Sequence, residues 1–246
     1  MQPKKRYFFI IFNLSMKSLL ITECLECKNK SLCFQQLDEK DLLLTNENKV
    51  QIRFKKGEII SKQGSFVTHI MYIKEGFAKV YKETDVDSNL ILDIIPEGKL
   101  IGLTTLFNSD NIARFSVAAL SDTIVCSIDR SVIEKLIYKN NNFAKTVILS
   151  LNTEALQFYD KMASLTQKQM NGRVADALIY LSENIFKSNE FEMFLSRKDL
   201  AEFTGMSTMS VVRTLKDLRK EGIIKDEKGR IDIKNLELLK KISQSG

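Results

Sequence analysis

The hydrophobic pattern of this chain changes its period once, at Asp129. Before this point, short β-branched and aromatic runs alternate with glycines, as in 58–61, 70–73, 78–81, 90–95 and 123–128. Runs of this kind with glycine turns are typical of an antiparallel sandwich or barrel. After this point, apolar residues recur in steps of three and four, which predicts helices. The 246 residues are enough for two domains, so we expect an α+β protein with its β domain first.

A long helix is predicted next to the β domain. Its apolar residues form a heptad seam that leads to Gln169: Ile148, Leu151, Ala155, Phe158, Met162 and Leu165. The seam predicts a helix of about 25 to 30 residues. Packing on its own β domain would also explain such a stripe. The length and the narrow a/d pattern favour a helix that pairs two copies of the chain.

Residues 196–215 fit a helix-turn-helix motif, after a helical segment 173–186 and a short strand 191–195. Ser196 is a suitable N-cap for the first helix. Gly205 falls where the turn needs a positive φ angle. Val211 is placed to pack the second helix onto the first, so the motif is complete at both ends.

The second helix of the motif is the predicted DNA-reading element. Hydroxyls and free N–H groups at its start can hold a DNA phosphate. Arg213 is expected to pair with guanine in the major groove, and Lys216 to contact phosphate. For Val212, on the same stretch, we expect a place in the core. The predicted DNA-binding residues are Ser207, Thr208, Met209, Arg213 and Lys216.

Residues 222–233 predict a β-hairpin with its turn at Lys228 and Gly229. A hairpin directly after a helix-turn-helix indicates a winged helix domain. The net charge of +6 suits a polyanionic partner such as double-stranded DNA. Glycine-rich nucleotide-binding motifs are absent, and the single histidine, His69, is interpreted as structural, so we do not expect an enzyme.

The four cysteines indicate a metal site. Cys24, Cys27 and Cys33 form a C-x2-C-x5-C run, and Cys126 follows on a predicted strand. Four thiolates are a full ligand set for an iron–sulfur cluster or for tetrahedral zinc. Zinc sites tend to use paired C-x-x-C motifs, and this chain has one, so iron–sulfur is favoured. A thiol switch, or a plain core role for Cys126, remains open.

The first residues predict no membrane anchor. A basic group, Lys4 to Arg6, precedes the apolar run 7–14, which is too short to cross a bilayer and has no cleavage site after it. Met16 is an alternative start, so residues 1–15 are expected to be a dispensable extension. We expect a cytoplasmic protein with no membrane partner.

A β-roll, a long dimerisation helix and a C-terminal winged helix-turn-helix together resemble the CRP/FNR family of bacterial transcription regulators. The cysteine pattern is similar to the FNR branch, and this implies that Cys24, Cys27, Cys33 and Cys126 ligate a [4Fe–4S] cluster. The resemblance also implies a homodimer that binds a palindromic operator, works with RNA polymerase and loses its cluster to oxygen or nitric oxide. The expected parts are an extension (1–23), a sensory domain (24–130), a dimerisation helix (131–169) and a DNA-binding domain (170–246).

Two departures from the family pattern refine these expectations. Gly98 and Gly102 match the phosphate cassette of the cyclic-nucleotide branch, but Leu103 replaces its carboxylate and no Arg-Ser pair surrounds Arg114. We therefore do not expect cyclic AMP to bind. In the reading helix only Arg213 matches the FNR branch, which implies a related but different operator. The alternative function is a regulator of the same architecture that responds to a small molecule or to thiol oxidation, without a cluster.

Overall fold

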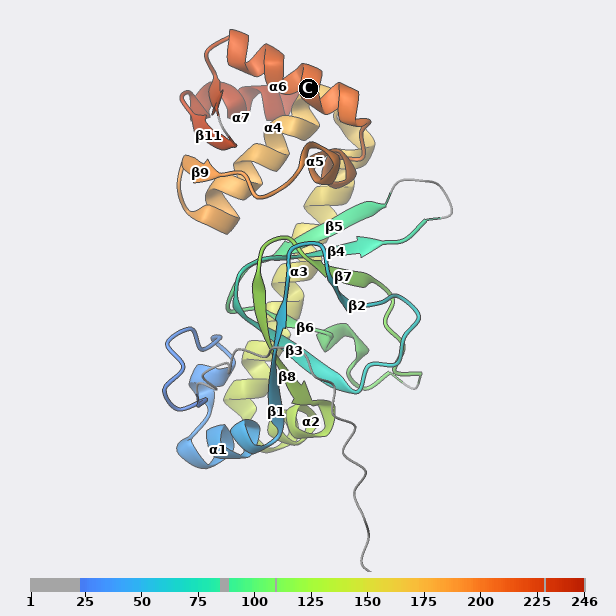
Figure 1. The fold of residues 1–246 in the computed structure, drawn as a ribbon, viewed down its shortest axis with the longest axis vertical. Helices are drawn as coiled ribbons and strands as arrows, with labels where there is room; N and C mark the ends of the chain where they lie inside the picture. Colours follow the sequence, from blue (N-terminus) through green and yellow to red (C-terminus); the bar gives the residue numbers. More distant parts are fainter. Residues whose placement is uncertain (1–22, 85–88, 109, 228, 246) are drawn as a thin grey trace, which may run out of the picture.

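A computed structural model describes residues 23–84, 89–108, 110–227 and 229–245 of the chain (Figure 1). The predicted extension 1–15, the alternative start Met16 and Lys228 of the predicted hairpin turn lie outside these residues. The fold is an N-terminal β domain, a long helix and a C-terminal helical domain with a small sheet. This confirms the predicted α+β fold class.

The β domain consists of two four-stranded antiparallel sheets. The first has the order β1-β8-β3-β6 and the second β2-β7-β4-β5. Buried apolar residues of both sheets, among them Ile73, Ala78, Val117 and Val125, form the core between them. The strands are β1 (Lys49–Phe54), β2 (Ile59–Ser61), β3 (His69–Glu75), β4 (Ala78–Lys82), β5 (Leu90–Ile95), β6 (Leu100–Ile101), β7 (Ser116–Ala119) and β8 (Thr123–Asp129).

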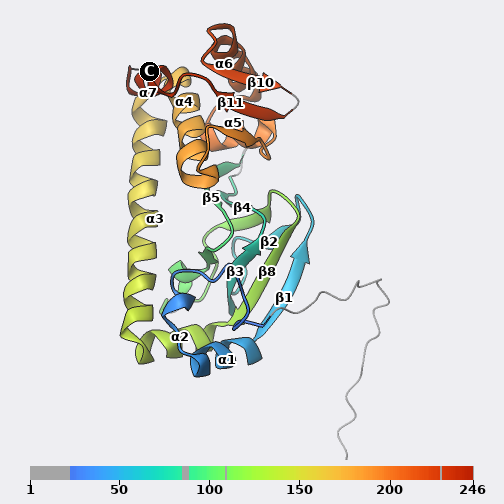
Figure 2. The same ribbon diagram turned by 90° about the vertical axis from the view of Figure 1, so that its left-hand side faces the viewer.

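A short arm precedes the sheets. It contains the three N-terminal cysteines, the 3-10 turn η1 (Phe34–Gln36) and helix α1 (Glu39–Glu47). The arm packs against the outer face of the first sheet and against the helices that follow it, which in Figures 1 and 2 is the lower end of the molecule. A second 3-10 turn, η2 (Leu103–Thr105), follows β6.

Two helices follow the β domain, with a break at Asn140. They are α2 (Arg130–Lys139) and α3 (Asn141–Gln167). The Asn140 side chain accepts a hydrogen bond from the backbone N–H of Phe143 and so begins the second helix. Helix α3 has 27 residues, as its heptad pattern predicted. Figure 2 shows it running along one side of the β domain up to the C-terminal domain.

The predicted seam of α3 is divided between two faces. Leu151 and Leu165 are half-buried against their own chain, as the alternative interpretation of the stripe required. Other apolar residues of α3 point into solvent: Ile148, Leu149, Leu156, Phe158, Tyr159 and Met162. The helix therefore packs on its own chain with one face and presents a second apolar face outward.

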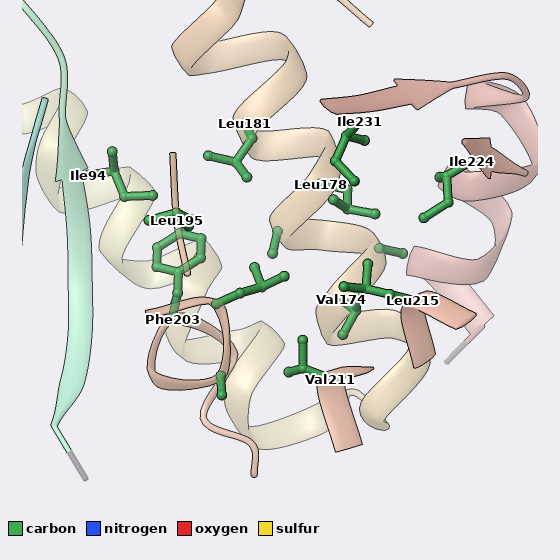
Figure 3. Packing of buried hydrophobic residues seen from close by; sticks show 14 of the residues in the cluster. Ile94, Val174, Leu178, Leu181, Leu195, Phe203, Val211, Leu215, Ile224 and Ile231 are labelled. Atoms are coloured by element: carbon green, nitrogen blue, oxygen red, sulfur yellow. The ribbon is translucent and has the colours of Figure 1, made fainter. Parts of the chain in front are cut away.

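The C-terminal domain packs around a hydrophobic cluster that also includes residues of the β domain (Figure 3). Its elements are α4 (Met170–Tyr180), a π-helical turn η3 (Leu181–Phe186), β9 (Glu190–Glu192), α5 (Arg197–Thr204), α6 (Thr208–Lys220), β10 (Ile224–Glu227), β11 (Arg230–Ile233) and α7 (Leu236–Ser245). The helical segment predicted from residue 173 begins three residues earlier, at Met170, and the predicted strand 191–195 is shorter and begins at Glu190. Strands β10 and β11 form the predicted hairpin, and β9 adds a third strand.

The two domains share apolar and charged contacts. Ile94 of β5 belongs to the same buried cluster as Phe203 of α5 (Figure 3). Phe77 stacks on Phe194, with ring centroids 4.4 Å apart. Lys79 of β4 donates to a carboxylate oxygen of Asp199 in α5 at 2.6 Å. Helix α5, the first helix of the helix-turn-helix, is thus held directly against the β domain.

Candidate metal centre and nucleic-acid interface

Local sequence signals set the geometry of the helix-turn-helix as predicted. Ser196 caps α5 in a capping box with Asp199, in which each side chain accepts from the other residue's backbone N–H. Gly205 ends α5 with φ of +61°. A Cβ atom there would lie 3.1 Å from Leu165 Cδ2 of α3, so this position is both left-handed and tightly packed.

Helix α6 divides into a buried and an exposed face. Val211, Leu215 and Leu218 are buried and fix the helix in the domain core. The exposed face carries Met209, Val212, Arg213 and Lys216. Met209 precedes the adjacent pair Val212 and Arg213 by three and four residues, and Lys216 follows that pair by four and three, so all four share one side of the helix. Val212 is 47% exposed, so its predicted core position is wrong. The side of α6 that carries Val211 already fills the domain core. Val212 therefore lies beside Arg213 on the outer surface.

The start of α6 offers backbone donors. Ser207 is its N-cap, and its hydroxyl oxygen accepts from the backbone N–H of Ser210 at 3.1 Å. The same hydroxyl lies 2.9 Å from the Ser210 hydroxyl, and either of the two can be the donor. Thr208 and Met209 occupy the first turn, where backbone N–H groups have no partner within the helix. Among the described residues, neither Arg213 nor Lys216 forms a salt bridge, and both side chains are exposed.

The cysteines gather on the face of the first sheet that the arm covers. Cys24, Cys27 and Cys126 line one small cavity of about 30 Å³. Cys33 does not line this cavity, but it is buried in the same hydrophobic cluster as Cys126. All four are free thiols. The fold therefore brings a cysteine arm and a distant strand together, as the sequence pattern required.

Strand register explains why Cys126 faces the arm. In β8, Cys126 lies directly opposite Gln51 of β1 on one side and Tyr72 of β3 on the other. Residues opposite one another in an antiparallel pair share a face of the sheet. Tyr72, Gln51 and Cys126 all line the cavity, so this row of three forms its floor.

Lysines surround the same cavity. Lys30, Lys49 and Lys74 belong to its lining. Lys49 Nζ donates to Cys24 Sγ at 3.2 Å, and Lys30 Nζ donates to the backbone oxygen of Leu25 at 2.8 Å. Ammonium groups at this position favour the negatively charged forms of nearby sulfur ligands.

Burial controls the protonation of the two inner cysteines. Burial raises the pKa of the Cys126 thiol to about 11, although Lys49 acts in the opposite direction. Burial also raises the pKa of Cys33, against a hydrogen bond from Ser31. Both groups are therefore protonated thiols near pH 7 and react slowly with oxidants on their own. Metal ions displace such protons when they bind thiolates.

The donor chemistry fits an iron–sulfur cluster, but the ligands are not preassembled. Among the described residues no group of three or more His, Cys, Asp or Glu side chains has the arrangement of a metal site. A cluster would require the arm to close its cysteines around it, because metal binding is coupled to the ordering of its ligands. Four thiols with no fifth cysteine, enclosed by apolar residues and three lysines, are a suitable donor set.

Contacts of the arm lead from the cysteines to α3. Phe34, directly after Cys33, packs edge-on against Tyr72 with ring centroids 5.7 Å apart. The same ring lies 6.0 Å from that of Phe143 in the first turn of α3. Asn140, the N-cap of α3, donates to the backbone oxygen of Gln36 at 3.0 Å. A movement of the arm would therefore act on the start of α3.

A larger cavity of about 910 Å³ lies between α3, the β domain and the C-terminal domain. Gly102, Leu103 and Arg114 line it, together with Glu154 and Lys161 of α3. Burial lowers the pKa of Lys161 to about 7. The sequence comparison of the phosphate cassette identified the first three of these residues. It did not predict the acidic and basic groups that α3 contributes.

Comparison with known proteins agrees with this architecture. Residues 51–140 match the family model of the cyclic nucleotide-binding domain, and residues 172–242 match that of the Crp-like helix-turn-helix domain. An anaerobic regulatory protein of Pasteurella multocida is 22% identical over 96% of this chain and 93% of its own length. The fumarate and nitrate reduction regulatory protein of Escherichia coli is 23% identical over 89% of this chain and 90% of its own length. These relatives are regulatory proteins rather than enzymes.

Solved structures show the same fold. FixK2 from Bradyrhizobium japonicum superimposes with a TM-score of 0.73 at 21% identity, covering 80% of this chain and 98% of its own. A CooA mutant from Carboxydothermus hydrogenoformans gives a TM-score of 0.72 at 19% identity, covering 87% and 95%. Across the described residues, no helix is long and apolar enough to cross a membrane.

Proposed function

We propose that this chain, which is a DNA-binding transcription regulator of the CRP/FNR type, controls its DNA affinity through an iron–sulfur cluster held by Cys24, Cys27, Cys33 and Cys126. The observation that carries the proposal is the convergence of the arm cysteines on Cys126, since three of the four thiols line one cavity. The names of the relatives, anaerobic and fumarate and nitrate reduction regulatory proteins, support a redox signal.

The cluster would supply sensitivity to oxygen or nitric oxide, which neutral buried thiols lack. The residues of the chain have separate tasks in this proposal. Cys24, Cys27 and Cys33 bring the arm to the sheet, and Cys126 anchors it there. Lys49 offsets the negative charge of the sulfur ligands at Cys24.

Transmission to DNA begins at the contacts of the arm with α3. Phe34 and Gln36 contact Phe143 and Asn140, at the N-terminal end of that helix. When the cluster is lost, release of the arm would loosen these contacts and shift α3. Because the outward apolar face of α3 suits a second copy of the chain, such a shift would change the pairing of two half-site readers.

At the DNA, Arg213 is proposed to pair with guanine, with Met209 beside it. Lys216, Ser207 and Thr208 are proposed to hold phosphates on either side. All five project from the exposed face or the N-terminus of α6. The proposed complex is a homodimer on a palindromic operator that works with RNA polymerase.

Metal content of protein purified without air tests the proposal. The parent is expected to contain about four iron and four sulfide atoms per chain, and Cys126→Ser is expected to lose them. Ser127→Ala, the neighbour on β8, is the matched control and should keep its iron. Zinc in place of iron, or a Cys126→Ser variant that retains full iron and sulfide, would contradict the proposed cluster.

A second candidate function rests on the cavity of about 910 Å³ beside α3. A small effector bound there would contact both α3 and the C-terminal domain, and could act without a cluster. Titration of metal-free protein with cyclic AMP and cyclic GMP, followed by operator binding, distinguishes the two. Tightened DNA binding by the metal-free protein would favour the effector.

A further inference from the structure

One polar group beside the cysteine cavity, the Tyr72 hydroxyl, is buried without a hydrogen-bond partner among the described residues. The Tyr72 side chain lines the cavity and is 3% exposed. A buried hydroxyl that forms no hydrogen bond destabilises the folded state, and such groups are rare in proteins. A hydroxyl of this kind indicates a partner that binds there.

The position of Tyr72 identifies the chemistry of that partner. Tyr72 lies directly opposite Cys126 in the strand register, and Cys24 and Cys27 line the same cavity. The edge-on contact with Phe34 fixes its ring between the arm and the sheet. Tyr72 therefore lines the same cavity as cysteines from both halves of the proposed site. A tyrosine hydroxyl is a hydrogen-bond donor, and thiolate sulfur is an acceptor.

We propose that the Tyr72 hydroxyl donates a hydrogen bond to sulfur at the cysteine site and thereby tunes the cluster's stability toward oxidants. This rests on the proposed function, because it requires a cluster at these cysteines. Hydrogen bonds to the sulfurs of an iron–sulfur site raise its reduction potential. Tyr72 is a positioning and tuning residue, and the metal ligands remain the four cysteines.

The proposal predicts opposite effects of one substitution in two forms of the protein. In the metal-free form, Tyr72→Phe removes a hydroxyl without a partner, so thermal stability is expected to stay equal or to increase. In the cluster-loaded form, the same change removes a donor. The reduction potential is then expected to fall, and air is expected to bleach the cluster about tenfold faster, as for the loss of one charge-assisted hydrogen bond.

Tyr81→Phe is the matched control, because Tyr81 is also buried but lies on β4 in the other sheet. We would compare parent, Tyr72→Phe and Tyr81→Phe by dye-coupled redox titration, by absorbance decay in air and by melting of the metal-free forms. Tyr81→Phe is expected to leave the potential and the bleaching rate unchanged.

Three results would overturn the inference. A Tyr72→Phe protein with the parent's potential and bleaching rate would show that the hydroxyl does not bond sulfur. A metal-free Tyr72→Phe protein that melts well below the parent, with an unchanged cluster, would show that the hydroxyl bonds water instead. A parent that takes up no cluster would overturn the proposed function itself, whereas the first two results would leave it intact.

Discussion

Arg213 shows how a single side chain is prepared for base recognition. It projects from the exposed face of α6, while Val211 and Leu215 of the same helix are buried in the core. The backbone that carries the guanidinium is thus rigidly held, and the guanidinium itself points to solvent. A guanidinium matches the two acceptors of guanine in the major groove better than any other side chain.

Replacing Arg213 with Ala is expected to weaken binding to a selected operator by about 1 to 3 kcal/mol and to relax selectivity at one base pair. Lys216→Ala should instead weaken binding to all sequences and reduce the dependence on salt concentration. Fluorescence anisotropy with operator and scrambled duplexes separates the two effects. Lys145→Ala is the control for net charge, because it removes one exposed charge near the N-terminal end of α3, away from α6. Equal losses for Arg213→Ala on both duplexes would contradict its role in base reading.

At the scale of elements, the outward face of α3 is the unusual feature. An isolated chain leaves Ile148, Leu156, Tyr159 and Met162 at least 40% exposed on one helix. Large exposed apolar stripes on a helix are typical of interaction sites. We propose a second copy of α3 as the partner, which would bring two α6 helices to successive half-sites.

A charge in this face is expected to break the pairing. Ile148→Glu should yield a folded monomer in analytical ultracentrifugation, because a carboxylate would be buried without a partner. Thr153→Glu, on an exposed position of α3 that lies outside the apolar stripe, is the control and should remain dimeric. A dimeric Ile148→Glu protein would show that the chains pair elsewhere.

Signals close together in the sequence predicted most of these elements. Ser196 and Gly205 define the ends of α5 through local capping and a local backbone angle, so the helix-turn-helix could be predicted from spacing alone. Val212 was misplaced because an apolar residue on a helix predicts core, unless the tertiary structure has already filled the core with another face. The division of the α3 seam also depends on tertiary structure, since Leu165 packs beside Gly205 of its own chain.

Contacts between distant residues could not be predicted from the sequence. The four cysteines indicated a site, but the position of Tyr72 beside Cys126 depends on the strand register. A shift of one residue would turn each side chain of the strand to the other face of the sheet. The partners of the arm on α3 likewise depend on how α1 and α2 pack. The pairing of Lys79 with Asp199 joins two domains across 120 residues, and the sequence around neither residue indicates it.

At the scale of the whole molecule, the contact of Lys79 with α5 connects the β domain to the C-terminal domain. Lys79 lies 2.6 Å from Asp199 and 3.4 Å from Glu202, and all three side chains are less than one-fifth exposed. Burial lowers the pKa of Lys79, but hydrogen bonds and charge attraction from the two carboxylates outweigh it, so the pKa is raised. Burial acts to raise the pKa of Asp199, and Lys79 with Ser196 outweighs it, so that pKa is lowered.

These directions fix the pH dependence of the contact. The Asp199 carboxylate stabilises the fold above its unfolded pKa of about 3.9 and loses this as pH falls through its lower folded value. The Lys79 ammonium stabilises the fold below its unfolded pKa of about 10.4 and loses this as pH rises through its higher folded value. The contact is therefore at full strength around neutral pH.

Lys79→Met should reduce the free energy of unfolding at pH 7 by about 3 kcal/mol, since it leaves the Asp199 carboxylate without its ammonium partner. Glu202 keeps an ion pair with Lys198 at 3.9 Å. The deficit should begin to shrink below about pH 3.9, the unfolded pKa of Asp199, as the pH falls toward the lowered folded pKa of that carboxyl. Lys62→Met is the control, because its ion pair with Glu83 is exposed and should contribute little. Urea unfolding at several pH values measures both. A constant deficit at all pH values would exclude the ion pair as its cause.

The central claim, that the cysteine site controls DNA binding, is tested most directly by one sample measured twice. Protein purified without air is titrated with an operator that it selected from random duplexes, and the same sample is titrated again after exposure to air while iron and sulfide are followed. We predict that operator affinity falls as the cluster is lost, and that Cys126→Ser shows the low affinity from the start. An affinity that stays constant while iron and sulfide disappear would contradict the account.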